Sequence, residues 1–298
     1  MRGQRKLSTN QKTNKGLQLF FAAVPLLLSF LISLISFFAA VFIRGVVFHT
    51  DLSSSEATDS GLVYLINFTM QIVIFGFWYI MILQERAPFS ARTEEPVKKR
   101  KKEQAEWHPV RYWATRLPIL LLLGYGLQLA VSAIISILST ALPSLFESYK
   151  ELIQSLAGEE IDWMTFIAVS FLAPVGEECM FRGITLHYAK GALSTRKAIL
   201  VQAVFFGIYH LNLIQFVYAL VIGYLLGILA DRAGSILPGI VLHSIINLSA
   251  YLIPSVFLDN IPKAALSAVL ALGVVIPCCI VMFKKPKKRR KTGDNHNK

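Results

Sequence analysis

Residues 161–186 read IDWMTFIAVSFLAPVGEECMFRGITL, a largely apolar segment that contains the charges of Glu177, Glu178 and Arg182. About 20 helical residues, each rising about 1.5 Å, are enough to cross a bilayer, so the segment predicts a transmembrane helix. A charged side chain at the centre of such a helix costs about 2.5–3.5 kcal/mol on insertion scales, and ionisable residues at this depth are site candidates. Two adjacent carboxylates therefore require an explanation.

Helical spacing distinguishes the two glutamates. Glu178 and Arg182 are four residues apart with the acid on the N-terminal side, an order that favours an ion pair. Glu177 is rotated by about 100° from Glu178 and has no such partner. Snorkelling of Arg182 to the membrane interface together with Glu178 would explain these two residues but not Glu177. The pattern favours a functional site in which one carboxylate is held ionised and the other is available for chemistry.

The composition indicates a membrane protein. Of 298 residues, 54% are hydrophobic and 16% are charged, which predicts an all-α fold, a polytopic transmembrane helical bundle. The net charge is +12, but the basic residues cluster beside apolar segments, where they meet lipid headgroups. We therefore expect anionic lipids as partners and no nucleic acid. The three cysteines (Cys179, Cys278 and Cys279) lie within predicted spans and define no disulfide framework.

The distribution of Lys and Arg predicts about eight spans with both termini in the cytoplasm. The expected spans are about 17–43, 61–83, 118–142, 161–186, two within 198–230, 236–253 and 264–283. Basic segments 1–16, 84–117 and 284–298 should lie on the cytoplasmic side. The run 198–230 is interpreted as two short spans that turn near Asn212, because a single helix would place the basic tail outside. This topology predicts a multi-pass protein of the cell membrane.

Polar side chains recur in two later spans. His210 follows Phe206 by four residues and His243 precedes Asn247 by four, so each pair shares a helix face. One histidine or amide inside a bundle often only joins helices. Two acids, two histidines and an amide on three helices can together carry out hydrolysis. The sequence has no His-Glu-x-x-His zinc helix and no Gly-x-Ser-x-Gly elbow, which leaves a carboxylate/histidine site.

The ordered motifs Glu177-Glu178-x-x-x-Arg182, Phe206-x-x-x-His210 and His243-x-x-x-Asn247 resemble the CAAX prenyl protease and bacteriocin-processing (CPBP, or Abi) family of intramembrane proteases. Gly223-x-x-x-Gly227 and the segment 234–238 (GSILP) are also similar, and Cys179 stands where an aliphatic residue is more usual. The resemblance covers roughly residues 160–255. It divides the chain into a basic N-terminus (1–16), N-terminal transmembrane helices (17–150) with the basic loop 84–117, a CPBP-like catalytic core (151–283) and a basic tail (284–298).

The resemblance implies an intramembrane endopeptidase of the CAAX protease-like type, whose substrate is a membrane-associated peptide or protein. Glu177 and Glu178, with His210, would activate water for hydrolysis of a peptide bond. His243 and Asn247 would complete the site. A donor such as Asn247, placed at the oxyanion, contributes about 3–4 kcal/mol.

Supporting and metal-binding roles are also implied. Arg182 would hold a glutamate in place, and Phe206 would pack behind His210. Zinc is a candidate cofactor with His210, His243 and Glu178 as ligands, because two histidines and a carboxylate bind zinc in several hydrolases. A carboxylate in an apolar environment can also act as a base without metal. Both alternatives stay open, with a slight preference for zinc.

Two other function classes remain open. A proton- or cation-coupled transporter also needs buried acids and histidines, but inverted repeats, which would favour it, are not found. A scaffold or bacteriocin immunity protein of the same fold would bind a partner without cleaving it, and the complete acid and histidine set argues against this. The compact chain without an organelle retrieval signal favours a bacterial plasma membrane.

Overall fold

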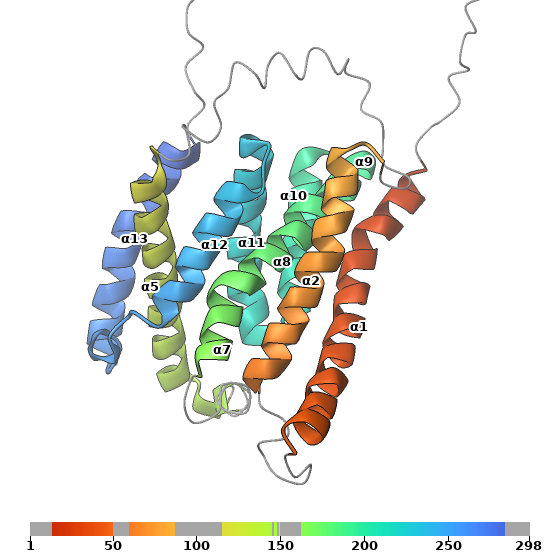
Figure 1. The fold of residues 1–298 in the computed structure, drawn as a ribbon. Coiled ribbons are helices and arrows are strands. Elements are labelled where there is room, and N and C mark those ends of the chain that lie inside the picture. The colour runs from red at the N-terminus through yellow and green to blue at the C-terminus, as the bar shows by residue number, and fades with distance from the viewer. Residues whose placement is uncertain are drawn as a thin grey trace, which may run out of the picture.

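The computed structural model describes residues 14–49, 60–86, 115–144, 146, 147, 149 and 162–283, and the regular structure within them is entirely helical. The helices are α1 (Lys15–Val47), α2 (Ser60–Leu83), α5 (Leu117–Ala141), α7 (Trp163–Ile167), η2 (Ala168–Leu172), α8 (Ala173–Glu178), η3 (Cys179–Thr185), α9 (Leu186–Ala192), α10 (Thr195–Tyr209), α11 (Leu213–Ala233), α12 (Leu237–Ala250), η4 (Ser255–Phe257) and α13 (Ile261–Phe283). They form one bundle, shown in Figure 1. The predicted all-α polytopic fold is confirmed.

Six helical segments in the described part of the chain are long and apolar enough to cross a membrane. One of them is the continuous segment from α7 to α9, Trp163–Ala192, which we call the central helix. The shorter helices α10 and α12 complete the bundle. The turn expected within 198–230 is present, since α10 ends at Tyr209 and α11 begins at Leu213. The sequence predicted two short spans here, but only α10, with 15 residues, is short. The 21 residues of α11 are enough to cross a bilayer.

The outer faces of the bundle are apolar. Phe38 of α1, Phe77 of α2 and Val269 of α13 are 62–66% exposed and belong to a much larger set of exposed aliphatic and aromatic side chains. A soluble protein rarely exposes such extended apolar surface. These faces suit contact with lipid hydrocarbon.

The central helix is the most buried span. In its most apolar window, 61% of residues are buried, against 28–39% in the other spans. One cluster of buried side chains joins the central helix to α1, α2 and α10, and a second cluster joins α5, α11, α12 and α13. Helix α12 also packs against α8 and η2. The glutamates of the central helix therefore lie where the two halves of the bundle meet.

The central helix is interrupted by two π-helical segments, η2 and η3. Pro174 stands just after η2, near the start of α8. Proline has no N–H and its ring clashes with the preceding turn, which gives a physical reason for the widened turn before it. Segments of π-helix are frequent at functional sites. Glu178 ends α8 directly before η3, so both glutamates lie between the two irregular segments.

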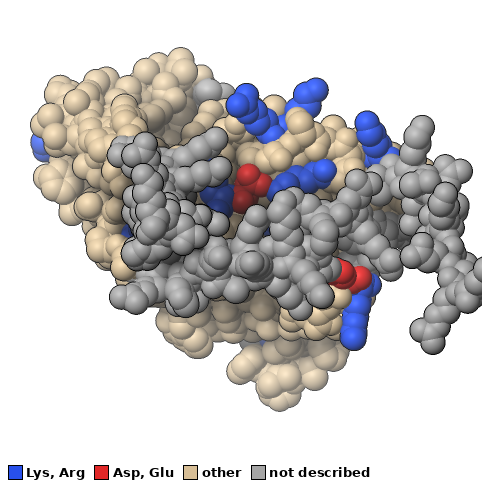
Figure 2. Space-filling view, turned by 90° about the horizontal axis from the view of Figure 1, so that it is seen from above, with Lys and Arg blue, Asp and Glu red and all other residues tan. Residues whose placement is uncertain are grey.

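With the central helix counted as one element, consecutive helices alternate in direction. The start of α1, the end of α2, the start of α5 and the end of α13 therefore lie at the same end of the bundle (Figure 1). The described basic residues at or near this end are Lys15, Arg86, Arg116, Lys190, Arg196, Lys197 and Arg232. Figure 2 shows this end from above, with Lys and Arg side chains spread over it. Two described acids, Glu85 and Asp231, also lie at this end, whereas the opposite helix ends carry Arg44 and Lys263 together with Glu147, Asp162 and Asp259. This asymmetry is the one expected of a cytoplasmic face.

Much of the predicted topology falls outside the described residues. Residues 1–13, 87–114 and 284–298 contain most of the three basic segments, and residues 51–59 contain the expected outer loop. The cytoplasmic location of the termini therefore stays a prediction, and so does the division of the chain into functional regions. The charge of the described helix ends agrees with that location.

Candidate active site

Three charged side chains from the central helix meet one histidine from α12. Glu177 and Glu178 come from α8, Arg182 comes from η3, and His243 lies in the middle of α12. All four residues are at most 4% exposed. Burying so many ionisable groups costs free energy unless opposite charges and hydrogen bonds compensate. The contacts between these four side chains therefore determine how the site is arranged.

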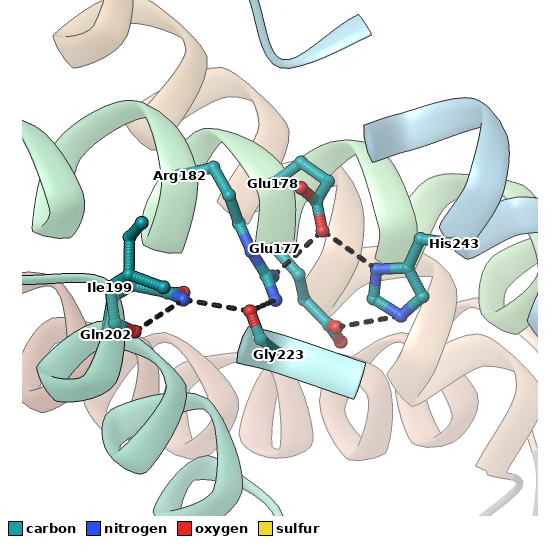
Figure 3. Close-up of polar contacts among 7 residues, drawn as sticks. All are labelled: Glu177, Glu178, Arg182, Ile199, Gln202, Gly223 and His243. Atoms are coloured by element: carbon teal, nitrogen blue, oxygen red, sulfur yellow. Dashed lines mark hydrogen bonds and ion pairs between the residues drawn. The ribbon is translucent and has the colours of Figure 1, made fainter. Parts of the chain in front are cut away.

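The His243 imidazole lies between the two carboxylates (Figure 3). Its Nδ1 atom is 3.1 Å from Oε1 of Glu178, a hydrogen-bonding distance. Its Nε2 atom is 3.6 Å from Oε2 of Glu177, which is an electrostatic contact beyond hydrogen-bond length. Both imidazole nitrogens thus face carboxylate oxygens.

The ion pair predicted from the spacing of Glu178 and Arg182 is present. Nη1 of Arg182 is 2.8 Å from Oε1 of Glu178, and both side chains are fully buried. Nη2 of Arg182 donates to the carbonyl oxygen of Gly223 on α11 at 3.3 Å, and Gln202 of α10 donates to the same carbonyl at 2.8 Å. The guanidinium also stacks over the Phe206 ring at 4.5 Å. Arg182 is therefore held from several helices and fixes Glu178.

Two glycines of α11 permit this close approach. A Cβ atom on Gly223 would lie 2.8 Å from Cδ1 of Phe206, and one on Gly227 would lie 3.0 Å from Cγ2 of Ile199. Small residues spaced by four allow helix backbones to approach closely inside membranes. The Gly223-x-x-x-Gly227 motif therefore brings the Gly223 carbonyl within reach of Arg182.

Phe206 links the two histidines. Its ring packs edge-on against His210 with centroids 5.1 Å apart, and against His243 at 5.6 Å. His210 follows the end of α10 and begins a turn in which Leu211 has a φ of 52°, an unusual conformation for a leucine. Asn212 then caps α11 by accepting from two backbone N–H groups. Strained, non-helical backbone beside a candidate catalytic histidine is typical of functional sites.

Asn247 lies one turn after His243 and also faces the central helix. Its Nδ2 atom donates to the carbonyl oxygen of Val169 in η2 at 2.9 Å. The widened turns of a π-helix disturb the regular backbone bonding, and a side-chain donor can satisfy the carbonyl that results. An amide nitrogen carries two protons, so this bond uses one of them. The predicted role of Asn247 as an oxyanion donor stays a prediction.

The predicted zinc ligands are not gathered into a metal-binding geometry. No group of three or more His, Cys, Asp or Glu side chains in the described residues has an arrangement that could hold a metal ion. Oε1 of Glu178 is shared by Arg182 and His243, and both His243 nitrogens face carboxylates. As arranged, this donor set does not fit a zinc site.

Several polar residues near the site were not singled out in the sequence. Gln202 is completely buried and anchors the Gly223 carbonyl. Asn67 and Gln71 lie one turn apart on α2, and Gln71 donates to the Tyr209 hydroxyl at 3.0 Å. Their amide side chains inside apolar spans could have indicated a role, because buried amides in a membrane form hydrogen bonds between helices. Their partners lie on other helices, so spacing along the chain could not identify them.

Gly239 of α12 makes room for the Glu178 carboxylate. A Cβ atom at this position would lie 2.6 Å from Oε2 of Glu178, so close that the carboxylate would have to move. We expect Gly239→Ala to displace the carboxylate from His243 and Arg182 and to lower activity by at least about tenfold, because catalytic groups act only in a narrow geometry. Rates of purified variants measure the effect. Gly76→Ala on α2 is the control, since nothing lies within 4 Å of its added Cβ, and equal rates in both variants would contradict the expectation.

The fold and the site define a multi-pass membrane protein with a buried carboxylate, arginine and histidine cluster. Residues 159–249 match the family model described as type II CAAX prenyl endopeptidase Rce1-like. The match includes every motif residue from Glu177 to Asn247, and it leaves α1, α2, α5 and α13 outside. The resemblance seen in the sequence is thereby confirmed. No curated protein and no solved structure matches the chain.

Proposed function

We propose that the protein is an intramembrane endopeptidase that hydrolyses a peptide bond in a membrane-associated peptide or protein. The family match supports a CAAX-type intramembrane endopeptidase at the level of the family. The observation that carries the proposal is the placement of the His243 imidazole against both Glu177 and Glu178 inside the bundle. A histidine shared by two buried acids is suited to moving protons at membrane depth.

The two glutamates have different roles in this proposal. Glu178 is neutralised by Arg182 and orients His243. Glu177 contacts the histidine at longer distance and is the general base. It takes a proton from water as the water oxygen attacks the carbonyl carbon of the scissile bond.

The reaction ends when the tetrahedral intermediate collapses. The bond from carbon to the leaving nitrogen breaks, and the proton taken up by Glu177 passes to that nitrogen, directly or through His243. The products are a carboxylic acid and an amine. His210 lies on the other side of the Phe206 ring from His243. Its proposed role is to bind the substrate or the attacking water. Asn247 is proposed as a donor to the oxyanion, where a preorganised hydrogen bond has a large effect.

The dependence of activity on zinc stays a prediction, and it can be measured separately. Metal analysis of purified, active protein, together with chelation and re-addition of zinc, tests whether activity depends on a bound ion. Full activity at well under one metal per chain would end the zinc hypothesis and leave the glutamate and histidine hydrolase intact.

The experiment that tests the proposed function compares peptides released from membranes with and without the protein. Membranes that contain the Glu177→Gln variant are the essential control, because they contain the same fold without the general base. A peptide that appears only with the wild-type chain identifies both cleavage and substrate. Identical peptide profiles would favour the transporter or immunity protein instead.

Membrane orientation gives a separate prediction. With both termini cytoplasmic, single cysteines placed at residues 51–59 in a Cys-less variant should react with an impermeant reagent added from outside. Cysteines placed at residues 98–102 should not react until the membrane is opened, because these residues then lie with the other basic segments inside. Labelling of residues 284–298 from outside would overturn the eight-span topology.

A further inference from the structure

Helices α10 and α11 pack together through pairs of one large and one small residue. Gln202 and Phe206 lie one turn apart on α10, and Gly227 and Gly223 lie one turn apart on α11. A Cβ atom on Gly227 would lie 2.4 Å from Nε2 of Gln202, and one on Gly223 would lie 2.8 Å from Cδ1 of Phe206. Each large side chain thus packs over a glycine of the other helix, and this fixes the alignment of the two helices.

The Gln202 amide connects the two helices. Its Nε2 atom donates to the carbonyl oxygen of Ile199 on its own helix at 2.9 Å and to that of Gly223 on α11 at 2.8 Å (Figure 3). These two bonds use both protons of the amide nitrogen. Amide side chains inside membrane bundles commonly form hydrogen bonds between helices in this way. Gln202 therefore holds one carbonyl of α11 against α10.

The same carbonyl contacts the arginine of the site. Nη2 of Arg182 donates to the Gly223 oxygen at 3.3 Å, while Nη1 pairs with Oε1 of Glu178 at 2.8 Å. A guanidinium is planar and rigid, so a contact on one side of it fixes the direction of the other side. Oε1 of Glu178 in turn lies 3.1 Å from Nδ1 of His243. An unbroken series of contacts therefore leads from Gln202 to the histidine.

The oxygen of the Gln202 amide indicates that this residue is not present for stability alone. Gln202 is completely buried, and its Oε1 atom has no hydrogen-bond partner in the part of the chain that the structure describes. A buried acceptor without a partner costs free energy, so an apolar side chain of the same length would pack here at least as well. A buried polar group of this kind requires an explanation, and the contact with the Gly223 carbonyl supplies one.

We propose that Gln202 is a positioning residue for Arg182. It holds the Gly223 carbonyl and thereby sets the orientation of the guanidinium. Through Glu178, this orientation determines where the His243 imidazole lies. The inference rests on the proposed function, in which Glu178 orients His243. Because Gln202 acts through Arg182, its loss slows the chemical step and does not weaken substrate binding.

The variant Gln202→Met removes the donor and keeps the length of the side chain. We expect kcat to fall about 3- to 10-fold, the range that corresponds to one hydrogen bond between neutral groups. KM should stay within about twofold. The thermal unfolding temperature should not fall, because the Gly223 carbonyl keeps Arg182 as a donor and the unpartnered Oε1 atom is removed. A side chain that only supported the fold would show the opposite result, with lower stability and wild-type kcat.

Gln128→Met is the matched control. Gln128 lies in the apolar span α5, and its Nε2 atom donates within that helix to Oγ of Ser132 at 3.2 Å. The same substitution at this position should leave kcat unchanged. Wild-type kcat in folded Gln202→Met would overturn the proposal, and so would an equal loss of kcat in the two variants.

A second substitution breaks the same hydrogen bond from the other helix. The Cβ atom of Gly227→Ala would lie 2.4 Å from Nε2 of Gln202, so the amide would have to move away from the Gly223 carbonyl. We expect kcat to fall about as much as in Gln202→Met, and the double variant should lose little more, because both changes remove one contact. Gly273→Ala on α13, where nothing lies within 4 Å of the added Cβ, should keep wild-type kcat. Losses that multiply in the double variant would contradict the proposal.

An infrared measurement separates this proposal from the proposed function. The carboxylate band that disappears in Glu178→Gln belongs to Glu178. This band should shift in Gln202→Met and not in Gln128→Met, because only Gln202 acts on the arginine that pairs with Glu178. If the band shifts but the wild-type chain cleaves no peptide, the positioning role is correct and the endopeptidase function is wrong. An unshifted band overturns the Gln202 proposal even when cleavage is observed.

Discussion

Glu177→Gln and Glu178→Gln should each reduce peptide cleavage by about 10²–10⁴-fold, the range of general acid–base contributions. Glutamine has nearly the same shape as glutamate, but at position 177 it cannot take a proton from water, and at position 178 it leaves His243 without its anionic partner. The two variants should differ in stability. Glu177→Gln leaves the ion pair of Arg182 with Glu178 intact, whereas Glu178→Gln leaves the Arg182 guanidinium buried without its acid. We therefore expect a lower thermal unfolding temperature only for Glu178→Gln.

Cleavage rates and thermal unfolding of detergent-purified variants measure both parts of this prediction. Asp259→Asn is the control, because it makes the same acid-to-amide change at an exposed ion pair with Lys263. This pair lies far along the chain from the site and should contribute little to stability. If both glutamine variants cleave at the wild-type rate, the assignment of the site is wrong. Equal stability of the two variants would instead contradict the unequal roles of the glutamates.

Hydrophobic segments and motif spacing predicted the main features of the bundle. An apolar run with enough residues to cross a membrane has few alternatives to a helix, because its backbone must be hydrogen-bonded internally. The turn near Asn212 followed from the charge of the tail, and the side chain of Asn212 does cap α11. The ion pair of Glu178 and Arg182 also followed, because it depends only on neighbouring turns of one helix.

Contacts between helices could not be predicted in the same way. The sequence placed His243 and Asn247 on one face, but it did not reveal that His243 would contact both glutamates while Asn247 binds the Val169 carbonyl. That difference arises from η2, where the backbone departs from regular helix. The hydrogen bond from Gln71 to Tyr209 was missed for a related reason, because it depends on which helices pack together.

Arg182→Ala should have the largest effect on stability of any single change at the site. Removing one partner of a buried ion pair leaves an uncompensated charge, which typically costs about 3–5 kcal/mol. The carbonyl of Gly223 and the ring of Phe206 would lose a contact at the same time. We expect poor folded yield and no cleavage. Arg182→Lys should recover only part of both, because an ammonium lacks the planar fork that reaches Glu178 and Gly223 together.

A paired substitution tests whether the loss comes from the uncompensated carboxylate. Replacing Arg182 with Met and Glu178 with Gln removes both charges, and neutral pairs often restore the stability that a single change destroys. The double variant should therefore unfold at a higher temperature than Arg182→Ala while still failing to cleave, because His243 has lost its anionic partner. Arg196→Ala, at an exposed position near the start of α10, is the control and should resemble the wild-type chain. Stability of Arg182→Ala equal to that of wild type would show that the buried pair does not hold the central helix in place.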